Sequence, residues 1–292
     1  MNLGFIGLGA MGRPMALNLR KTDHALWVFS RNPGRAQTLV EAGATLAASP
    51  FAVARAVDVL FLNVSDDAAV ESVLFGPQGA AAGLRADSVV VDMGTTSPTA
   101  TRGFAARLAE AGVAWLDAPV SGGEAGAKAA TLSIMVGGSV AAFAWVLPLF
   151  QTMGKNIVHV GETGAGQVAK ACNQIVVSAT LLGVAEALTF ARKQGVDAAK
   201  VRAALLGGSA YSRILEIHGQ RMLTREFTPG FRARLHQKDM GIVLAEARQA
   251  NVAVPSAALA ARMLNALVAA GAGELDSAAL VTLLERLAGL EA

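Results

Sequence analysis

The sequence has few of the residues that mark a disulfide-linked, metal-binding or nucleic-acid-binding protein. It contains one cysteine, Cys172, which excludes an intramolecular disulfide and predicts a reducing compartment, the cytoplasm. The four histidines are scattered with no metal-ligand spacing, so no metal site is predicted. The net charge is only +3 and no basic cluster accompanies it, so no nucleic-acid partner is predicted.

Charged residues are also scarce, at 16%, whereas hydrophobic residues make up 53% of the 292 residues. This composition predicts a compact chain, and the length favours two domains. Residues 1–20 begin apolar, but glycines interrupt them and Arg13 follows, so we expect no signal peptide. The uncharged run Ile175–Ala185 is too short for a confident membrane span, and no membrane association is predicted.

A glycine-rich loop directly follows the first predicted strand, Leu3–Ile6, and Pro14 suits the first turn of the helix that comes next. Gly7 permits the tight turn, Gly9 lets the backbone approach a pyrophosphate, and Gly12 allows close packing of helix on strand. The helix N-terminus adds N–H donors and partial positive charge. The residues predicted to bind a dinucleotide here are Gly7, Leu8, Gly9, Ala10, Met11 and Gly12.

The second predicted strand, Ala25–Phe29, ends in a basic segment. An NAD-specific site usually has an acidic residue at this place to grip the ribose 2′-hydroxyl, and none is present. Ser30, Arg31, Asn32 and Arg35 can instead receive the 2′-phosphate of NADPH. We therefore predict NADP(H), with NAD as a weaker alternative; a solvated basic turn is the competing interpretation.

Further strand and helix patterns alternate as in a doubly wound sheet. The expected strands are Val57–Leu62, Ser88–Asp92, Ala114–Asp117, Thr131–Val136 and Ile157–Val160, with a helix near Ala141–Gln151. Because open α/β sheets bind ligands at the carboxyl ends of their strands, Asn63, Val64 and Thr95 are added to the predicted cofactor site.

A turn of Ser121, Gly122 and Gly123 follows another predicted strand. One hydroxyl and two approachable backbone N–H groups would make a small site for a carboxylate, although an ordinary turn has the same composition.

The segment 162–194 predicts a long helix with a uniformly apolar centre, which requires a covering surface. Cys172 is expected to be a small core residue of this helix. Lys170 near its start has no acidic residue three or four positions away, and Asn173 and Gln174 share its face. It is either a lysine reaching from a helix end to water or a desolvated proton donor beside two amides.

Only helical patterns follow, at Ala198–Leu206, Tyr211–Leu223, Ala233–Ala250, Ser256–Ala270 and Ser277–Leu290. The predicted fold class is α/β. We expect an N-terminal Rossmann-type doubly wound sheet over residues 1–161, a connecting helix over 162–194, and an all-α C-terminal domain over 195–292.

Together these motifs resemble the β-hydroxyacid dehydrogenase family over essentially the whole chain. The shared segments are the glycine loop, Asp117–Gly123, Gly164–Gln167 with Lys170 and Asn173, and Lys238-Asp239. The family includes 3-hydroxyisobutyrate dehydrogenase, tartronate semialdehyde reductase and glyoxylate/succinic semialdehyde reductase.

The resemblance implies specific roles. Lys170 is the catalytic acid/base, and Ser121, Gly122 and Gly123 hold the substrate carboxylate. Asn173 and Phe231 complete the substrate pocket with Asp239 nearby, and Lys238 reaches the cofactor or substrate.

It also implies a homodimer or homotetramer that acts on a small hydroxyacid or its semialdehyde. Gln174 replaces an asparagine of many members, which leaves the substrate open. The alternatives are an imine reductase-like enzyme, in which Asp or Tyr typically replaces the lysine, and a non-catalytic binding protein of the same fold, which loses the lysine. 6-Phosphogluconate dehydrogenase is a related but much longer chain with His where this chain has Asn173.

Overall fold

The computed structural model describes residues 1–290, which form two compact units. The first unit is Met1–Lys170, and the second begins at Ala171. The functional division of the chain remains a prediction; the segments expected from the sequence are 1–161, 162–194 and 195–292.

Within residues 1–290, nine strands form one sheet in the first unit. They are β1 (Asn2–Ile6), β2 (Ala25–Phe29), β3 (Thr45–Leu46), β4 (Val59–Leu62), β5 (Val89–Asp92), β6 (Ala114–Asp117), β7 (Val120–Ser121), β8 (Leu132–Gly138) and β9 (Gly154–Gly161). Their order is β3-β2-β1-β4-β5-β6-β8-β7, with β9 paired to β8. Strands β1 to β6 are parallel, whereas β8 runs antiparallel to β6 and β7. The predicted Rossmann-type doubly wound sheet is confirmed.

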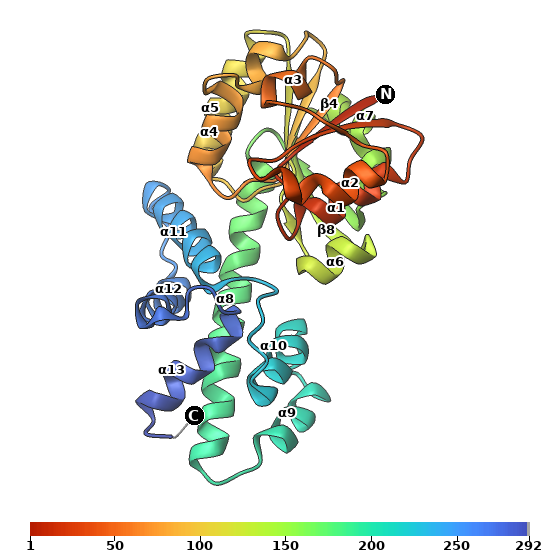
Figure 1. The fold of residues 1–292 in the computed structure, drawn as a ribbon. Helices are drawn as coiled ribbons and strands as arrows, with labels where there is room; N and C mark the ends of the chain where they lie inside the picture. The colour runs from red at the N-terminus through yellow and green to blue at the C-terminus, as the bar shows by residue number, and fades with distance from the viewer. Residues whose placement is uncertain (291–292) are drawn as a thin grey trace. The chain divides into compact units, whose positions relative to one another are not determined.

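Helices cover both faces of this sheet, which is why β4 and β5 are buried along their whole length and read as continuous apolar runs. One face carries α1 (Gly12–Arg20), α2 (Gln37–Glu41), α6 (Gly123–Ala129) and α7 (Val140–Phe150). The other carries α3 (Pro50–Ala54), α4 (Asp67–Phe75) and α5 (Pro98–Ala109) (Figure 1). Two short 3₁₀ turns, Pro33–Ala36 and Ala80–Gly83, complete the unit. The sheet therefore has one apolar core on each side.

The second unit is helical throughout its described residues. Its elements are α9 (Ala198–Leu206), α10 (Arg213–Thr224), α11 (Ala233–Gln249), α12 (Pro255–Leu267), a π-helical turn (Val268–Ala272), a 3₁₀ turn (Ser277–Ala279) and α13 (Leu280–Leu287). They surround the long helix α8 (Ala165–Lys193), shown in green in Figure 1. Leu181, Leu182, Ala185 and Leu188 of α8 form the centre of this core. The expected all-α C-terminal part is confirmed.

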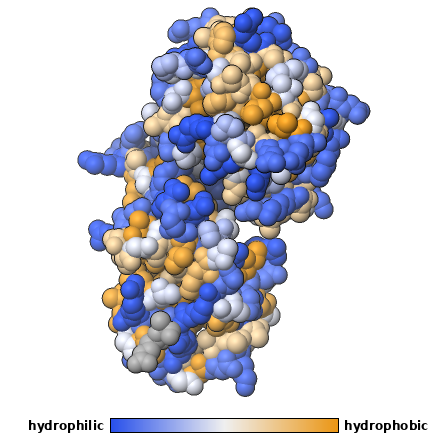
Figure 2. All heavy atoms as spheres, viewed as in Figure 1, coloured by the Kyte–Doolittle hydropathy of each residue, from blue (hydrophilic) through white to orange (hydrophobic). Residues whose placement is uncertain are grey.

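Helix α8 is not covered all round within its own chain. By length and composition it is the one helix of residues 1–290 that could cross a membrane, yet half of its most apolar window is buried in the protein. Val176 and Phe190 are 65% and 67% exposed. Cys172 is also exposed, so the prediction that it is a core residue was wrong. Figure 2 shows apolar residues interspersed with hydrophilic ones on one face of each unit.

Candidate functional site

The predicted cofactor residues of the first unit lie in loops at one edge of the sheet. Strands β2, β1, β4 and β5 are neighbours and parallel, so their carboxyl ends lie at the same edge. The strand order reverses at β1, because β2 lies on one side of it and β4 lies on the other. A crevice at such a switch point is where doubly wound sheets bind ligands.

The glycine loop after β1 has the geometry that a dinucleotide requires. Gly7 has a φ of +102°, and a Cβ there would lie 2.2 Å from the carbonyl oxygen of Asn63. A Cβ on Gly12 would lie 1.9 Å from the carbonyl oxygen of Gly7. A Cβ on Gly9 would meet nothing within 4 Å, so its backbone faces open space. The loop therefore packs too closely for a side chain at Gly7 and Gly12, whereas its backbone at Gly9 faces open space. This arrangement fits a bound pyrophosphate.

The segment after β2 contains no carboxylate and presents two exposed arginines, Arg31 and Arg35. The Asn32 side chain accepts a hydrogen bond from the backbone N–H of Gly34 (3.1 Å), and Ser30 Oγ accepts from Asn32 N (3.3 Å). These bonds fix the turn, and both guanidinium groups stay at the surface beside the end of β2.

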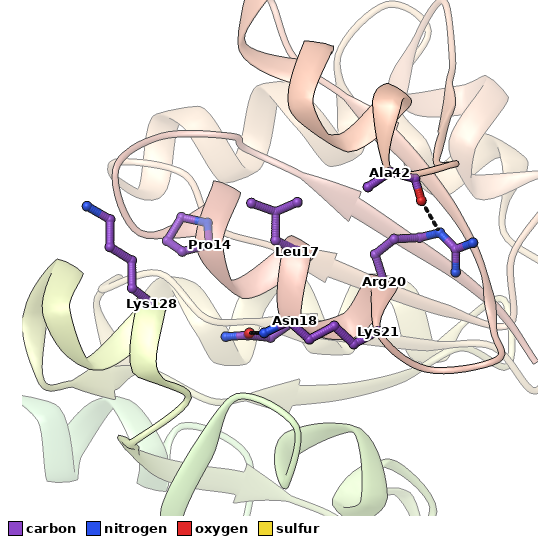
Figure 3. A pocket seen from close by; sticks show the side chains of 7 residues that line it. All are labelled: Pro14, Leu17, Asn18, Arg20, Lys21, Ala42 and Lys128. Atoms are coloured by element: carbon purple, nitrogen blue, oxygen red, sulfur yellow. Dashed lines mark hydrogen bonds between the residues drawn. The ribbon is translucent and has the colours of Figure 1, made fainter.

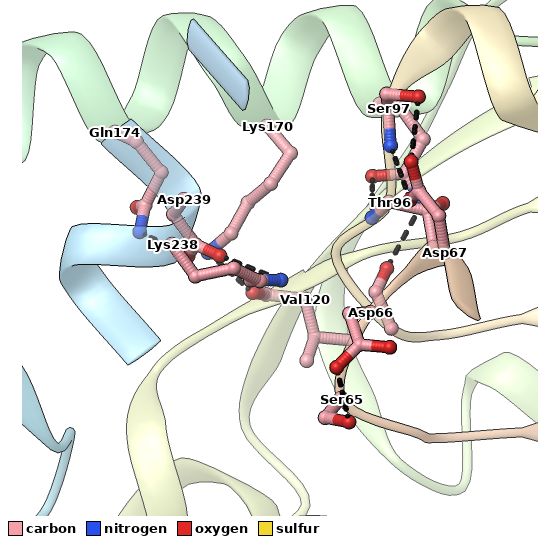
Figure 4. A network of polar contacts seen from close by, with 12 residues as sticks. Ser65, Asp66, Asp67, Thr96, Ser97, Val120, Lys170, Gln174, Lys238 and Asp239 are labelled. Carbon is pink, nitrogen blue, oxygen red and sulfur yellow. Dashed lines mark hydrogen bonds and ion pairs between the residues drawn. The ribbon is translucent and has the colours of Figure 1, made fainter. Parts of the chain in front are cut away.

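The loops after β4 and β5 are tied together. Asn63 Nδ2 donates to the carbonyl of Met93 (3.1 Å), and Asp67 accepts from the backbone N–H and the hydroxyl of Ser97, each at 2.9 Å (Figure 4). Gln167 on α8 adds a third tie on both sides of Thr95: its amide donates to Gly94 O (2.9 Å) and accepts from Thr96 N (3.3 Å). Thr95 is therefore held in place by residues that the sequence analysis did not single out.

Asp117 at the end of β6 fixes the start of α8. Its carboxylate is fully buried and accepts from the backbone N–H groups of Gly164 (2.8 Å) and Gln167 (2.9 Å). Gly164 has a φ of +91°, which is why the helix begins at Ala165. Burial raises the pKa of Asp117 above its ordinary value, although the backbone hydrogen bonds act in the opposite direction.

Lys170, one turn further along α8, points into the unit and not toward water. Its side chain is only 8% exposed, and Nζ donates to the carbonyl of Val120 at 2.9 Å (Figure 4). Val120 immediately precedes Ser121, where β7 ends. Gly122 and Gly123 have φ values of +133° and +63°, so this turn requires glycine. The structure thus places the ammonium of Lys170 beside the turn that was predicted to bind a carboxylate.

In the second unit, three predicted polar residues and Gln174 form one chain of contacts. Asn173 Nδ2 donates to Gln174 Oε1 (2.8 Å), and Gln174 Nε2 donates to Asp239 Oδ2 (2.7 Å). The other carboxylate oxygen, Asp239 Oδ1, lies 2.9 Å from Lys238 Nζ. Asp239 is 3% exposed, so its pair with Lys238 is not the solvated surface contact that adjacent opposite charges usually make.

The remaining predicted residue of this unit, Phe231, lies beside a buried histidine. The rings of Phe231 and His236 are 5.2 Å apart, and His236 is completely buried. Ser178 Oγ lies 2.7 Å from His236 Nε2 and 2.9 Å from Met240 Sδ. These contacts join α8 to α11 one turn beyond Gln174.

An open pocket of about 410 Å³ lies on α1 beside α6, and none of the predicted site residues lines it (Figure 3). Arg20, Lys21 and Lys128 give it a basic lining, but each cation meets an acceptor of the protein. Arg20 donates to Ala42 O (2.9 Å), Lys21 to Asn18 Oδ1 (2.8 Å), and Lys128 pairs with Glu124 (2.7 Å). Within residues 1–290, no group of three or more His, Cys, Asp or Glu side chains is arranged to hold a metal ion.

Comparison with known proteins adds to this geometry. Residues 2–161 match the family described as the NAD binding domain of 6-phosphogluconate dehydrogenase, and residues 164–284 match the NAD-binding family of NADP-dependent 3-hydroxyisobutyrate dehydrogenase. The chain is 47% identical over 288 residues to 2-hydroxy-3-oxopropionate reductase of Escherichia coli, covering 99% of this chain and 98% of that protein. The chain belongs to the β-hydroxyacid dehydrogenase family.

Two further relatives show the range of this family. The NAD-dependent L-serine dehydrogenase of Pseudomonas aeruginosa is 36% identical, with 94% of each chain covered. The crystal structure of 3-hydroxyisobutyrate dehydrogenase from Salmonella typhimurium superimposes with a TM-score of 0.89 at 29% identity, covering 97% of this chain and 99% of that one. This member of the β-hydroxyacid dehydrogenases is therefore an NAD(P)-dependent oxidoreductase, and the glycine loop belongs to its NAD(P)-binding domain.

Sequence reasoning about this β-hydroxyacid dehydrogenase missed the residues that support the site from behind. Asp117 and Gln167 belong to motifs that carried the resemblance, but their partners lie 50 and 73 positions away in the chain. Gln174 was noted as a neighbour of Lys170 on the same helix face and as a variation within the family, but it was not predicted as a site residue. Its contact with Asp239 could not be read from the sequence, because the two residues are 65 positions apart.

Proposed function

We propose that this chain is an NADP(H)-dependent oxidoreductase that interconverts a small β-hydroxyacid or 2-hydroxyacid and its semialdehyde or oxo acid. Among glyoxylate, succinic semialdehyde, tartronate semialdehyde and 3-hydroxyisobutyrate, 2-hydroxy-3-oxopropionate (tartronate semialdehyde) is the first substrate to test, because the relative that reduces it by name is 47% identical. The observation that carries the proposal is the contact between Lys170 Nζ and Val120 O, which holds the ammonium beside Ser121.

In this proposal the first unit supplies three functions. Ser121 Oγ and the N–H groups of Gly122 and Gly123 bind the substrate carboxylate, since the positive φ values of both glycines bring the backbone close to a ligand. Lys170 provides the proton, and Gln167 and Asp117 position it by fixing the start of α8. Burial of Lys170 keeps water from competing for its proton.

The bound nicotinamide supplies or accepts the hydride. In reduction, Lys170 Nζ donates a proton to the oxygen that becomes the alcohol. In oxidation, neutral Lys170 accepts the same proton, so one group acts as general acid and general base. The carbonyl of Val120 accepts a hydrogen bond from Nζ and orients it in both directions, because the ammonium and the neutral amine both carry N–H donors.

NADPH is proposed as the preferred cofactor and NAD(H) as the weaker one. Arg31 and Arg35 are exposed beside the end of β2, with no carboxylate between them. A 2′-phosphate would pair with them, whereas a ribose hydroxyl would lack the carboxylate that normally holds it.

A homodimer or homotetramer in the cytoplasm completes the proposal. The exposed side chains of Val176 and Phe190 on α8 form apolar surface that a second copy would cover. The single cysteine is in keeping with a reducing compartment.

Lys170→Ala tests the proposed catalysis. We expect kcat to fall by at least about 10²-fold, with the Kd of NADPH little changed, because a general acid is lost and the cofactor loops remain. Activity is followed by NADPH absorbance on a panel of small semialdehydes and hydroxyacids, with NADH in parallel.

Lys193→Ala is the matched control, because Lys193 also donates to a backbone carbonyl, that of Ala288, from the far end of the same helix. It should leave turnover unchanged. A folded Lys170→Ala protein with full activity would reject Lys170 as the proton donor.

A further inference from the structure

The polar contacts of the second unit converge on one buried carboxylate. Asp239 is 3% exposed, and each of its oxygens has a partner: Oδ1 is 2.9 Å from Lys238 Nζ, and Oδ2 accepts from Gln174 Nε2 at 2.7 Å. A buried carboxylate with both oxygens engaged is poorly suited to bind an anionic substrate, which it would also repel. Its geometry instead fits a group that holds other side chains.

Gln174 connects the carboxylate of Asp239 to helix α8. It is 3% exposed, and its amide donates to Asp239 while its carbonyl oxygen accepts from Asn173 Nδ2 at 2.8 Å. The donation to Asp239 fixes which end of the amide faces Asn173, since the nitrogen must point to the carboxylate. An asparagine at position 174 would be shorter by about one C–C bond, roughly 1.5 Å, and could not keep the 2.7 Å contact without movement of the helices.

We propose that Asp239 is a positioning residue, which through Gln174 orients Asn173 and through its ion pair orients Lys238. This inference rests on the proposed function and on the roles that the family resemblance implies, in which Asn173 serves the substrate and Lys238 the cofactor or substrate. Gln174 is then a specificity-determining residue, because its side chain contacts both the carboxylate on α11 and the amide on α8. Asp239 makes no contact with the substrate in this arrangement.

Two variants test separately the effect of Asp239 on Asn173 and its effect on Lys238. Gln174→Leu removes both amide contacts and leaves the Lys238 ion pair. It should raise the KM for a carboxylate substrate by roughly 10-fold and leave the Kd of NADPH within about twofold. Asp239→Asn removes the charge that holds Lys238 and should raise the Kd of NADPH by roughly 10-fold, measured by fluorescence titration of the cofactor without turnover.

Ser178→Ala is the matched control for a purely structural role. Ser178 lies one turn beyond Gln174, is 2% exposed, and also bonds to α11, through His236 and Met240. It should lower the Tm and leave both KM and Kd unchanged. If all three variants lower the Tm while KM and Kd stay at their wild-type values, the contacts are structural and the proposal is rejected.

The double variant Gln174→Leu/Asp239→Asn tests the link itself. If Asp239 acts on Asn173 through Gln174, the double variant should raise KM no more than the larger of the two single effects. If the two effects on KM multiply instead, Asp239 does not act on Asn173 through Gln174. The Kd measurements are independent of the Lys170 test. A fully active Lys170→Ala protein would reject the proposed catalysis. The Kd of NADPH for Asp239→Asn, compared with that for Ser178→Ala, would still show whether Asp239 holds Lys238.

Discussion

Single residues of the first unit divide between those proposed to touch ligands and those that hold them. Ser121 and Lys170 belong to the first group, and Asp117 and Gln167 to the second. Ser121 lies at the end of β7, and the buried Lys170 has its ammonium beside that turn. Asp117 and Gln167 are buried behind them and form hydrogen bonds that fix the start of α8 and the loop after β5. Changes in the two groups should therefore affect different constants.

Ser121→Ala should mainly raise the KM for acid substrates. The hydroxyl is one of three donors proposed for the carboxylate, and its loss should cost roughly 10-fold in KM. The same aldehyde without its carboxylate should be a poor substrate for both proteins. Steady-state kinetics on the pair of substrates checks this; an equal loss on both would show that the turn serves the fold.

In the proposed function, cofactor choice depends on the arginines after β2. Arg31→Ala should raise the KM for NADPH while leaving that for NADH within a few-fold, and loss of one charge-assisted bond should cost on the order of 10- to 100-fold in preference. Stacking of Arg31 on adenine would affect both cofactors, so the double change with Arg35→Ala is the cleaner measurement.

Arg55→Ala serves as the control for this pair. Arg55 lies over the Phe51 ring, away from the end of β2, and its loss should not alter the ratio of the two KM values. Wild-type protein that uses NADH as well as NADPH on its best substrate would overturn the argument.

The residues that could be predicted are those whose role is local. The glycine loop was predictable because strand, turn and helix follow each other within about a dozen residues, and each glycine has its own steric reason. The contact between Lys170 and Val120 was not, because 50 positions separate them and only the fold brings them together. The same holds for Gln174 and Asp239, 65 positions apart.

At the scale of elements, the clearest stabilising feature is the buried carboxylate that joins α10 to the segment before α13. Asp276 is fully buried and accepts from Arg221 (2.8 Å) and from the N–H groups of Gly230 (2.9 Å), Phe231 (3.0 Å) and Ala278 (3.0 Å). Burial by itself would raise the pKa of Asp276, but His218, whose Nδ1 lies 3.4 Å from Oδ1, and the N–H groups of Ala278 and Phe231 outweigh it and lower the pKa below its ordinary value of 3.8.

Asp276→Asn should therefore lower stability in a pH-dependent way. A carboxyl whose pKa is lower in the folded state stabilises the protein above its unfolded pKa, and this contribution is lost as pH falls through the folded pKa. At neutral pH we expect a loss of about 1.5–3 kcal/mol, the usual range for hydrogen bonds to a charged group. The difference from wild type should shrink as the pH falls below 3.8.

Urea denaturation at several pH values measures this difference. Glu226→Gln is the control: hydrogen bonds from the Thr228 side chain and backbone N–H also lower the pKa of Glu226, but this side chain lies at the surface, so its change should leave the denaturation midpoint unaltered. A constant difference between Asp276→Asn and wild type across the whole pH range would contradict the assignment.

Element boundaries followed the sequence where a chemical signal marks them. Ser97 and Ser139, a residue type that favours N-caps, cap α5 and α7, and Ser139 lies just before the helix expected near Ala141–Gln151. The antiparallel direction of β8 carried no such signal, because an apolar strand reads the same in either direction. The exposed face of α8 could not be predicted either, because the sequence shows that a residue is apolar but not which partner covers it.

For the whole molecule, the prediction is assembly. Light scattering at micromolar concentration should give the mass of a dimer or tetramer, because the exposed apolar residues of α8 need cover. Val176→Asp should shift the mass toward the monomer with the Kd of NADPH unchanged. A monomer mass for the wild type would reject the prediction.

Leu259→Asp provides the comparison. Leu259 is 52% exposed on α12, so a charge there adds the same polarity at a different helix. It should leave the mass of the wild-type assembly unchanged. Dissociation by both variants would mean that the interface is not centred on α8.

The exposed thiol of Cys172 gives this protein a built-in reporter. Because the chain has no other cysteine, a maleimide dye would attach at one position without any mutagenesis. That position lies one helical turn before Val176, on the stretch of α8 proposed to meet a second copy. The rate of labelling would then depend on protein concentration, and one fluorophore per chain would report association by energy transfer in the wild-type protein.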